Sequence, residues 1–189
     1  MRYAPEHNDA TRERILDAAS RLFREHGIAA VGLAKIMAEA DLTVGTFYTH
    51  FKSKEALLRE VLLRSLDARH EELVQAFHGA DLEMLVRAYL SPEHRDDSGT
   101  GCPVAALASE VARHPRATRQ TFSSHNAPTL DAHAARLSSR QGTEVSRADA
   151  AAFLGLLAGT LQLARATPDR AESDAILEAG VRAAIRLAT

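Results

Sequence analysis

The chain has 189 residues, 46% of them hydrophobic, which is enough for one or two domains with a substantial core. Its formal net charge of −2 argues against a general, sequence-independent nucleic-acid binder. No run of about 18 apolar residues occurs and the N-terminus is polar, which excludes a membrane span or signal peptide and predicts a cytoplasmic protein. With no Trp, no Asn-Gly turn and no strand-like alternation, the sequence predicts an all-α fold of about nine helices.

Two short helices joined by a turn are predicted between Val31 and Leu57. Apolar residues at helical spacing form one face, a polar turn interrupts it, and the pattern then resumes: Leu33, Ile36, Met37 and Ala40, then Asp41-Leu42-Thr43, then Phe47 and Phe51. This pattern indicates a helix-turn-helix over about residues 32–51. It would form the centre of an N-terminal DNA-binding domain of residues 1–53.

The second helix of this pair has a polar, open N-terminal end. Thr43 is predicted to cap it by accepting a hydrogen bond from a backbone N–H two or three residues further on. Gly45 and Thr46 are small enough to let the backbone approach bases in the major groove. Ser53 is predicted to cap the next long helix, which places Lys54 in a first turn that attracts phosphate.

The segment from about Thr11 to Leu58 resembles the DNA-binding domain of the TetR (tetracycline repressor) family of bacterial transcription regulators. The family's Phe-x-x-x-Gly is present as Phe23 to Gly27, its Ile-Ala pair corresponds to Ile36-Met37, and its helix tip matches Gly45 to Leu57 almost throughout. The resemblance implies a homodimer that binds a palindromic operator of double-stranded DNA and regulates transcription, as a repressor.

The chain departs from the family pattern at several positions. Val31 and Gly32 stand where Thr or Ser is usual, Asp41 replaces a turn glycine, and Val44 occupies a position often Lys or Arg and, by resemblance, aimed at the bases. A valine can only pack against apolar surface such as a thymine methyl, so thymine is expected there. The predicted DNA contacts are Thr43, Val44, Gly45, Thr46, Tyr48, Thr49, His50, Lys52 and Lys54.

Residues 54–189 are predicted to form a C-terminal ligand-binding and dimerisation domain. Its first helix runs to about residue 77, and a shorter one from Asp81 to Leu90 ends before Pro92. The polar segment from Glu93 to Gly101 indicates a flexible loop. A helix then starts at Cys102-Pro103 and ends near His114-Pro115. The next one, to about Ser139, is expected to be kinked or broken near Asn126 because it contains Pro128.

The last two predicted helices, Ser146 to Ala166 and Ser173 to about Leu187, carry small apolar residues along one face. The first begins with a capping-box pattern of Ser146 and Asp149. By resemblance, these helices pair with their copies in a second subunit; the alternative is burial within one subunit. The predicted dimer contacts are Gly155, Gly159, Ala175, Ala179 and Ala183.

A pocket for a small-molecule effector is predicted among the helices that follow Lys54, with His70 or Asn126 as polar anchors in an apolar wall. The alternative is that these residues are plain core. Gly101 to Phe122 and Leu161 to Ala166 further resemble the LmrA and YxaF-like subgroup of repressors, which implies a lipophilic or aromatic effector. The predicted lining is Leu66, His70, Phe77, Met84, Tyr89, Phe122, Asn126, Phe153, Leu157 and Leu161.

Other site chemistries have little support in the sequence. The nine histidines form no i, i+4 pair, so no metal site is predicted, and no cofactor or catalytic motif is present, so no enzyme is expected. Cys102, the single cysteine, is either a redox-sensitive thiol at a helix N-terminus or buried packing. Two alternatives to the effector-controlled regulator stay open: control by a protein partner, and a helical ligand-binding protein that no longer reads DNA.

Overall fold

A computed structural model of the chain describes residues 5–189, with side chains from residue 9 onward, and the described part contains ten α-helices and no strand. This confirms the all-α prediction; α6 is the helix beyond the predicted nine. The helices are α1 (Pro5–His26), α2 (Leu33–Glu39), α3 (Val44–His50), α4 (Lys54–Gly79), α5 (Leu82–Tyr89), α6 (Pro92–Asp96), α7 (Pro103–Val111), α8 (Arg116–Gln141), α9 (Arg147–Ala166) and α10 (Arg170–Leu187).

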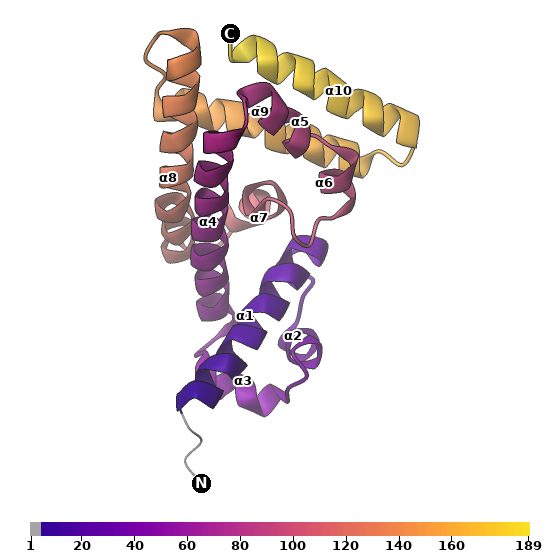
Figure 1. The fold of residues 1–189 in the computed structure, drawn as a ribbon. Coiled ribbons are helices and arrows are strands. Elements are labelled where there is room, and N and C mark those ends of the chain that lie inside the picture. The colour runs from indigo at the N-terminus through magenta and orange to yellow at the C-terminus, as the bar shows by residue number, and fades with distance from the viewer. Residues whose placement is uncertain (1–4) are drawn as a thin grey trace.

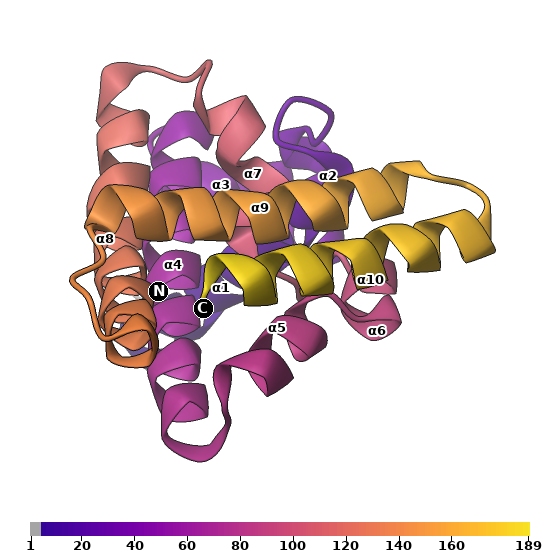
Figure 2. The same ribbon diagram turned by 90° about the horizontal axis from the view of Figure 1, so that it is seen from above.

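The helices form two connected regions (Figure 1). At one end, α1, α2 and α3 pack around the start of α4. The long helices α4 and α8 run side by side away from this end, and α9 and α10 lie across their far end. From above, α9 and α10 lie next to each other as the outermost layer (Figure 2). The N-terminal helices are therefore separated from α9 and α10 by much of the length of α4.

Two local predictions in the middle of the chain need correction. The predicted loop after Pro92 begins instead with α6, because Ser91 accepts a hydrogen bond from the His94 backbone N–H at 3.2 Å and Pro92 suits a first turn. Of the kink or break predicted near Asn126, the break is absent, since α8 continues through Pro128. Asn126 and Thr129, on either side of this proline, are both buried, so tertiary packing maintains a helix that the proline alone would weaken.

Helix ends depend on short side-chain caps. The Ser53 hydroxyl accepts a hydrogen bond from the Ala56 N–H at 3.1 Å, as predicted, and the capping box of Ser146 and Asp149 is present. The last helix begins at Arg170, three residues before the predicted start, because Asp169 caps it by accepting from the Glu172 N–H at 2.8 Å.

Two apolar clusters make the core. The first joins α1 to α4 and also includes Leu107 and Val111 of α7, both almost fully buried. The second joins α5, α9 and α10 with parts of α7 and α8. Because α4 and α7 contribute to the first cluster, the core has no break at residue 53, and the division into 1–53 and 54–189 stays a prediction.

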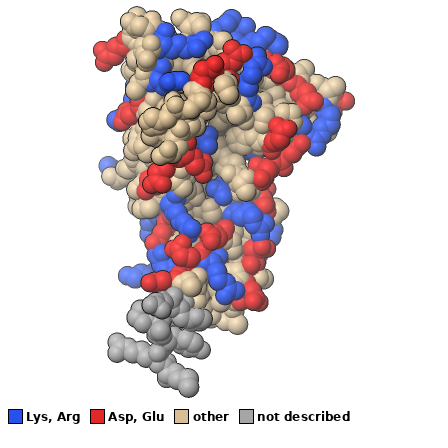
Figure 3. All heavy atoms as spheres, in the orientation of Figure 1, with Lys and Arg blue, Asp and Glu red and all other residues tan. Residues whose placement is uncertain are grey.

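On the face shown in Figure 3, acidic and basic side chains are interspersed. None of the helices in residues 5–189 is both long enough and apolar enough to cross a membrane.

Candidate functional site

Helix α3 lies at the tip of the N-terminal region. One of its faces packs against the core, and the opposite face is exposed. Phe47 is fully buried and stacks on Phe51, with ring centroids 5.6 Å apart. The same packing leaves Val44 at 43% and Tyr48 at 65% exposure, and Gly45 is also exposed. The exposed residues of α3 thus form a surface that is held in place by the buried ring of Phe47 and its stacking on Phe51.

The threonines in and just before α3 bond to one another or to the backbone of this helix. The Thr43 side chain makes no capping bond to the backbone, so the predicted cap is wrong; its hydroxyl is 3.1 Å from that of Thr46. The Thr49 hydroxyl donates to the Thr46 carbonyl at 2.7 Å. The four N-terminal N–H groups of α3 are consequently left without a side-chain cap from Thr43.

The basic residues after Phe47 differ in their exposure and in whether they are already engaged within the chain. Lys52 is exposed, and His50 is partly exposed, with a pKa that partial burial and the charge of Arg12 lower. The Lys54 ammonium instead donates to the Ile28 carbonyl at 2.5 Å and lies 5.8 Å from the centroid of the Phe23 ring. Burial lowers the pKa of Lys54. A phosphate contact by Lys54 would require it to leave this position.

The turn between α2 and α3 sets the angle at which α3 is presented. Asp41 adopts a left-handed backbone conformation with φ = 53°, which explains why the family pattern has glycine there. The Arg14 guanidinium holds the turn by donating to the carbonyls of Ala40 at 2.5 Å and Asp41 at 3.4 Å. Gly32, where a hydroxyl residue is usual, gives α2 no side-chain cap.

Two carboxylates connect this region to α7 and α8. The Glu110 carboxylate accepts hydrogen bonds from the backbone N–H groups of Ile28 at 3.0 Å and Ala29 at 2.9 Å, in the turn after α1. Glu55, in the first turn of α4, bonds with the Thr118 hydroxyl and with His114 Nδ1 at 3.1 Å. Sequence reasoning missed these contacts, because the partners lie far apart in the chain.

The burial of Glu55 acts to raise its pKa, but the hydrogen bonds from Thr118 and His114 outweigh this effect, and the net result is a lowered pKa. The carboxylate is therefore held ionised between the start of α4 and the α7–α8 corner.

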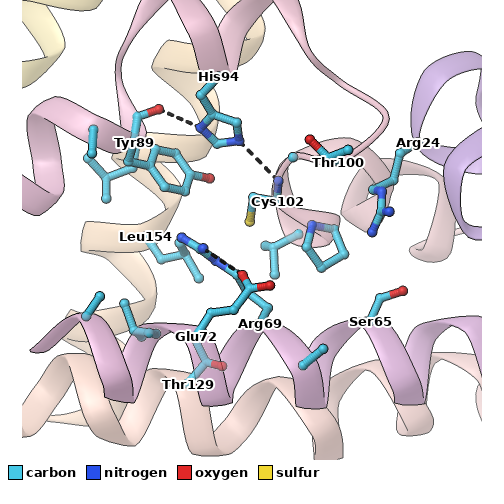
Figure 4. A pocket seen from close by; sticks show the side chains of 18 of the residues that line it. Arg24, Ser65, Arg69, Glu72, Tyr89, His94, Thr100, Cys102, Thr129 and Leu154 are labelled. Atoms are coloured by element: carbon cyan, nitrogen blue, oxygen red, sulfur yellow. Dashed lines mark hydrogen bonds and ion pairs between the residues drawn. The ribbon is translucent and has the colours of Figure 1, made fainter.

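A cavity of about 780 Å³ lies between α1, α4, α5, α7, α8 and α9 (Figure 4). Four of the predicted ligand residues line it: Phe77, Tyr89, Phe153 and Leu157. Six do not: Met84 is 60% exposed, while the others pack elsewhere, namely Leu66, His70, Phe122, Asn126 and Leu161.

Polar residues that sequence reasoning did not assign to the pocket also border the cavity, among them Arg24, Arg69, Cys102, Thr129 and His133. The mixed composition of α8 obscures its apolar periodicity, so the sequence did not indicate that Thr129 and His133 border the cavity. Cys102 is 4% exposed, which agrees with the packing alternative and leaves a redox role untested.

His94 organises one side of this cavity (Figure 4). Its Nδ1 lies 2.6 Å from the Tyr89 carbonyl, and its Nε2 lies 3.1 Å from the Cys102 backbone nitrogen. Because a backbone N–H can only donate, Nε2 accepts and Nδ1 carries the proton, so the ring is neutral. Burial lowers the pKa of His94, in agreement with a neutral ring.

The outer face of α9 and α10 carries the predicted dimer contacts. Gly155, Gly159, Ala175 and Ala179 are exposed and Ala183 is partly buried. A Cβ atom at Gly155 or Gly159 would meet no atom within 4 Å. The small residues predicted to allow close approach therefore face outward. No group of three or more potential metal ligands occurs among the residues that the structure describes.

Comparison with known proteins gives matches in sequence and in fold. Residues 15–61 match the family model described as "Bacterial regulatory proteins, tetR family". The HTH-type transcriptional regulator UidR of Escherichia coli (strain K12) is 30% identical over 118 residues, which are 61% of this chain and 59% of that protein. The HTH-type transcriptional regulator TtgR of Pseudomonas putida is 37% identical over 81 residues, 43% of this chain and 38% of that protein. The chain thus spans about three-fifths of UidR, and less of TtgR.

Solved structures share the fold over nearly the whole chain. A TetR-family transcriptional regulator from Agrobacterium tumefaciens has a TM-score of 0.76 at 23% identity, covering 93% of this chain and 97% of that one. The reduced form of E. coli NemR has a TM-score of 0.74 at 20% identity, covering 93% and 95%. At these identities the likeness establishes the fold.

Proposed function

We propose, from an N-terminal region that belongs to the tetR family of bacterial regulatory proteins, that the whole chain is a transcriptional repressor. It binds a palindromic DNA operator as a homodimer and is released by a small lipophilic or aromatic effector. The exposed tip of α3, carried on buried Phe47, is the observation that supports this proposal most directly. DNA binding of this kind would place the protein in the cytoplasm.

In this proposal α3 enters the major groove and Val44 faces a base. Tyr48, His50 and Lys52 contact phosphates, and the small exposed Gly45 allows close approach. The remaining contacts, Thr43, Thr46, Thr49 and Lys54, are proposed on the family pattern alone, since their polar groups already have partners within the chain.

Dimerisation through α9 and α10 is the second part of the proposal. Two copies of this exposed face of small residues would pack as four helices and hold two α3 tips about 34–36 Å apart, the repeat of the DNA major groove. The open space at Gly155 and Gly159 supports close approach of a partner helix.

The cavity is the proposed effector site. Its volume of about 780 Å³ suits a small molecule and favours such an effector over control by a protein partner. The effector would release DNA if it binds more tightly to the form of the dimer in which the distance between the two α3 helices does not match the operator. The expected coupling free energy is about 1–3 kcal/mol. Membership of the LmrA and YxaF-like subgroup, based on residues 101–122 and 161–166, is also proposed.

The experiment is a gel shift with purified protein and the DNA upstream of its own gene, repeated over a salt series. Lys52→Gln is compared with Arg140→Gln, which removes the same charge from an exposed position at the end of α8. We expect tight binding that weakens with salt. Lys52→Gln should weaken it and lower the slope of log affinity against log salt by about 1 per subunit, whereas Arg140→Gln should not.

Equal behaviour of the two variants would remove Lys52 from the DNA interface. Absence of binding at low salt would contradict the regulator proposal and favour a helical ligand-binding protein that no longer reads DNA.

A further inference from the structure

Three buried polar groups on the cavity wall have no hydrogen-bond partner. They are the Tyr89 hydroxyl, the Thr129 hydroxyl and Nδ1 of His133, on side chains that are 7%, 5% and 7% exposed. A buried polar group without a partner costs about 1–3 kcal/mol, so proteins seldom leave several together. Three of the five such groups among the described residues lie on this one cavity, the other two being His70 Nδ1 and Asn126 Oδ1, and this clustering indicates that a bound molecule supplies the missing hydrogen bonds.

Two of these groups form a pair within an aromatic wall. Thr129 and His133 are four residues apart on α8, so they lie on the same helix face. The His133 ring packs edge-on against Phe77, with centroids 5.7 Å apart, and lies 5.9 Å from Phe153. The ligand atoms that meet Thr129 and His133 are therefore polar, while those beside them are apolar or aromatic.

The unpartnered groups are all neutral. Burial and the charge of Arg69 lower the pKa of His133 to about 4, and burial raises the pKa of Tyr89. The Tyr89 hydroxyl therefore stays protonated and can donate, with only the weakly bonding thiol of Cys102 beside it.

The three arginines on the wall already have partners. The Arg69 guanidinium is 3.3 Å from the Glu72 carboxylate (Figure 4) and lies 6.0 Å from the centroid of the Tyr89 ring. Arg24 donates to the Gly99 carbonyl at 2.6 Å. Arg64 pairs with Glu13 at 2.5 Å and with Asp17. A charged ligand that paired with Arg69 or Arg64 would have to break an existing ion pair, and a ligand charge left unpaired in the cavity would lose its hydration without compensation.

We infer that the effector is an uncharged molecule with an aromatic or similarly flat apolar body and a hydroxyl or carbonyl oxygen that hydrogen-bonds with Thr129 and His133. This inference rests on the proposed function, since it takes the cavity as the effector site. The Thr129 hydroxyl can donate or accept, and a neutral imidazole offers one donor and one acceptor nitrogen, so both kinds of oxygen fit.

The test is direct titration of the purified full-length protein, without DNA, with three probes of one shape: 2-naphthol, 2-naphthoate and 2-methylnaphthalene. The chain has no Trp, so naphthalene fluorescence reports binding without indole interference. We expect 2-naphthol to bind about tenfold more tightly than either of the others, the hydroxyl providing the hydrogen bond that the methyl lacks.

The matched variants are Thr129→Val, which replaces the hydroxyl with a methyl group of similar shape, and Thr121→Val on the same helix outside the cavity wall. Thr129→Val should weaken 2-naphthol binding about five- to tenfold, leave 2-methylnaphthalene unchanged or slightly tighter, and Thr121→Val should change neither. His133→Gln, which keeps hydrogen-bonding groups, should retain more 2-naphthol affinity than His133→Leu.

Tighter binding of 2-naphthoate, absence of 2-naphthol binding, or equal binding by Thr129→Val would each overturn the inference. A separate gel shift with operator DNA tests the proposed function. Binding of 2-naphthol by the free protein without release of DNA would keep the assignment of the cavity but contradict its role as an effector site.

Discussion

The carboxylate of Glu110 on α7 binds the backbone of the turn after α1. One oxygen accepts a hydrogen bond from the Ile28 N–H at 3.0 Å, and the other accepts from the Ala29 N–H. The turn after α1 thus depends on a side chain from a helix that begins at the cavity, since Cys102 and Pro103 line it. One short helix therefore connects the cavity wall with the turn after α1.

The first prediction concerns this contact. Glu110→Gln should lower the free energy of unfolding by about 1 kcal/mol, because an amide has one accepting oxygen where the carboxylate has two. It should also reduce the effect of an effector on operator affinity while leaving effector binding to the free protein unchanged. Denaturant unfolding, titration and gel shifts measure the three quantities. Glu144→Gln, at an exposed loop position, serves as the control.

If Glu110→Gln and Glu144→Gln behaved alike in all three assays, the contact between α7 and the turn would have no energetic role.

The second prediction concerns Asp41, whose φ of 53° is unfavourable for residues with a Cβ atom. Asp41→Gly should be more stable than Asp41→Ala by about 1 kcal/mol, because glycine adopts this conformation without steric conflict. The exposed ion pair with Arg14, at 3.7 Å, is lost equally in both variants and so does not affect the comparison. Urea unfolding would measure the difference; an alanine variant as stable as the glycine variant would contradict it.

The third prediction is a pH dependence. The pKa of His133 falls from 6.5 to about 4 on folding because the ring is buried, so the folded state disfavours its protonation. Its contribution to stability is therefore complete above pH 6.5 and is lost as the pH falls towards 4, by about 3 kcal/mol in total. His133→Gln should remove this slope from the free energy of unfolding, measured by urea denaturation from pH 7 to pH 4.

Replacement of the exposed His78 by Gln is the control for this pH series and should leave the slope unchanged. A His133→Gln protein that loses stability over the same range as the unaltered chain would show that other groups cause the dependence.

The fourth prediction separates two kinds of glycine in α9 and α10. A Cβ at Gly180 would lie 3.0 Å from Leu90 Cδ1 and would overlap the Thr160 side chain, so Gly180→Ala should destabilise the chain by about 1–3 kcal/mol. At Gly159 the space is open, and Gly159→Ala should not lower the free energy of unfolding. Thermal or urea unfolding at low protein concentration measures both. The same loss in both variants would contradict the view that Gly159 faces outward.

The fifth prediction concerns base preference at α3. Val44 is exposed and apolar, so it can pack on a thymine methyl, whereas Val44→Lys could donate to guanine. Selection of binding sites from random DNA should therefore give thymine at one step for the unaltered chain and guanine for the variant. The same consensus for both proteins would remove Val44 from the bases.

Features set by neighbouring residues were predictable from the sequence. The Ser53 cap and the capping box of Ser146 and Asp149 each involve partners three residues apart, and both are present. The Thr43 cap failed although it obeys the same rule, because the nearby Thr46 hydroxyl offers an alternative partner. Local patterns thus state which bonds are possible and leave open which one forms.

Features that join distant segments could not be predicted in this way. The partners of Glu110 lie 82 and 81 residues earlier in the chain, and no periodicity connects them. Likewise, Thr129 and His133 acquire their place on the cavity only through the packing of α8 against α4 and α9. The aromatic wall was partly predicted because large apolar residues favour burial wherever they occur.

The length of α7, nine residues, is constrained because both ends of the helix make specific contacts. Each added or removed residue would turn the last residues by about 100° relative to the first and move them by about 1.5 Å along the axis. A deletion between Pro103 and Glu110 would thus rotate the carboxylate away from the turn after α1 even if the cavity kept its shape. Related sequences are accordingly expected to vary in length in the loop before α7. Within α7 they are expected to differ by substitution, without insertion or deletion.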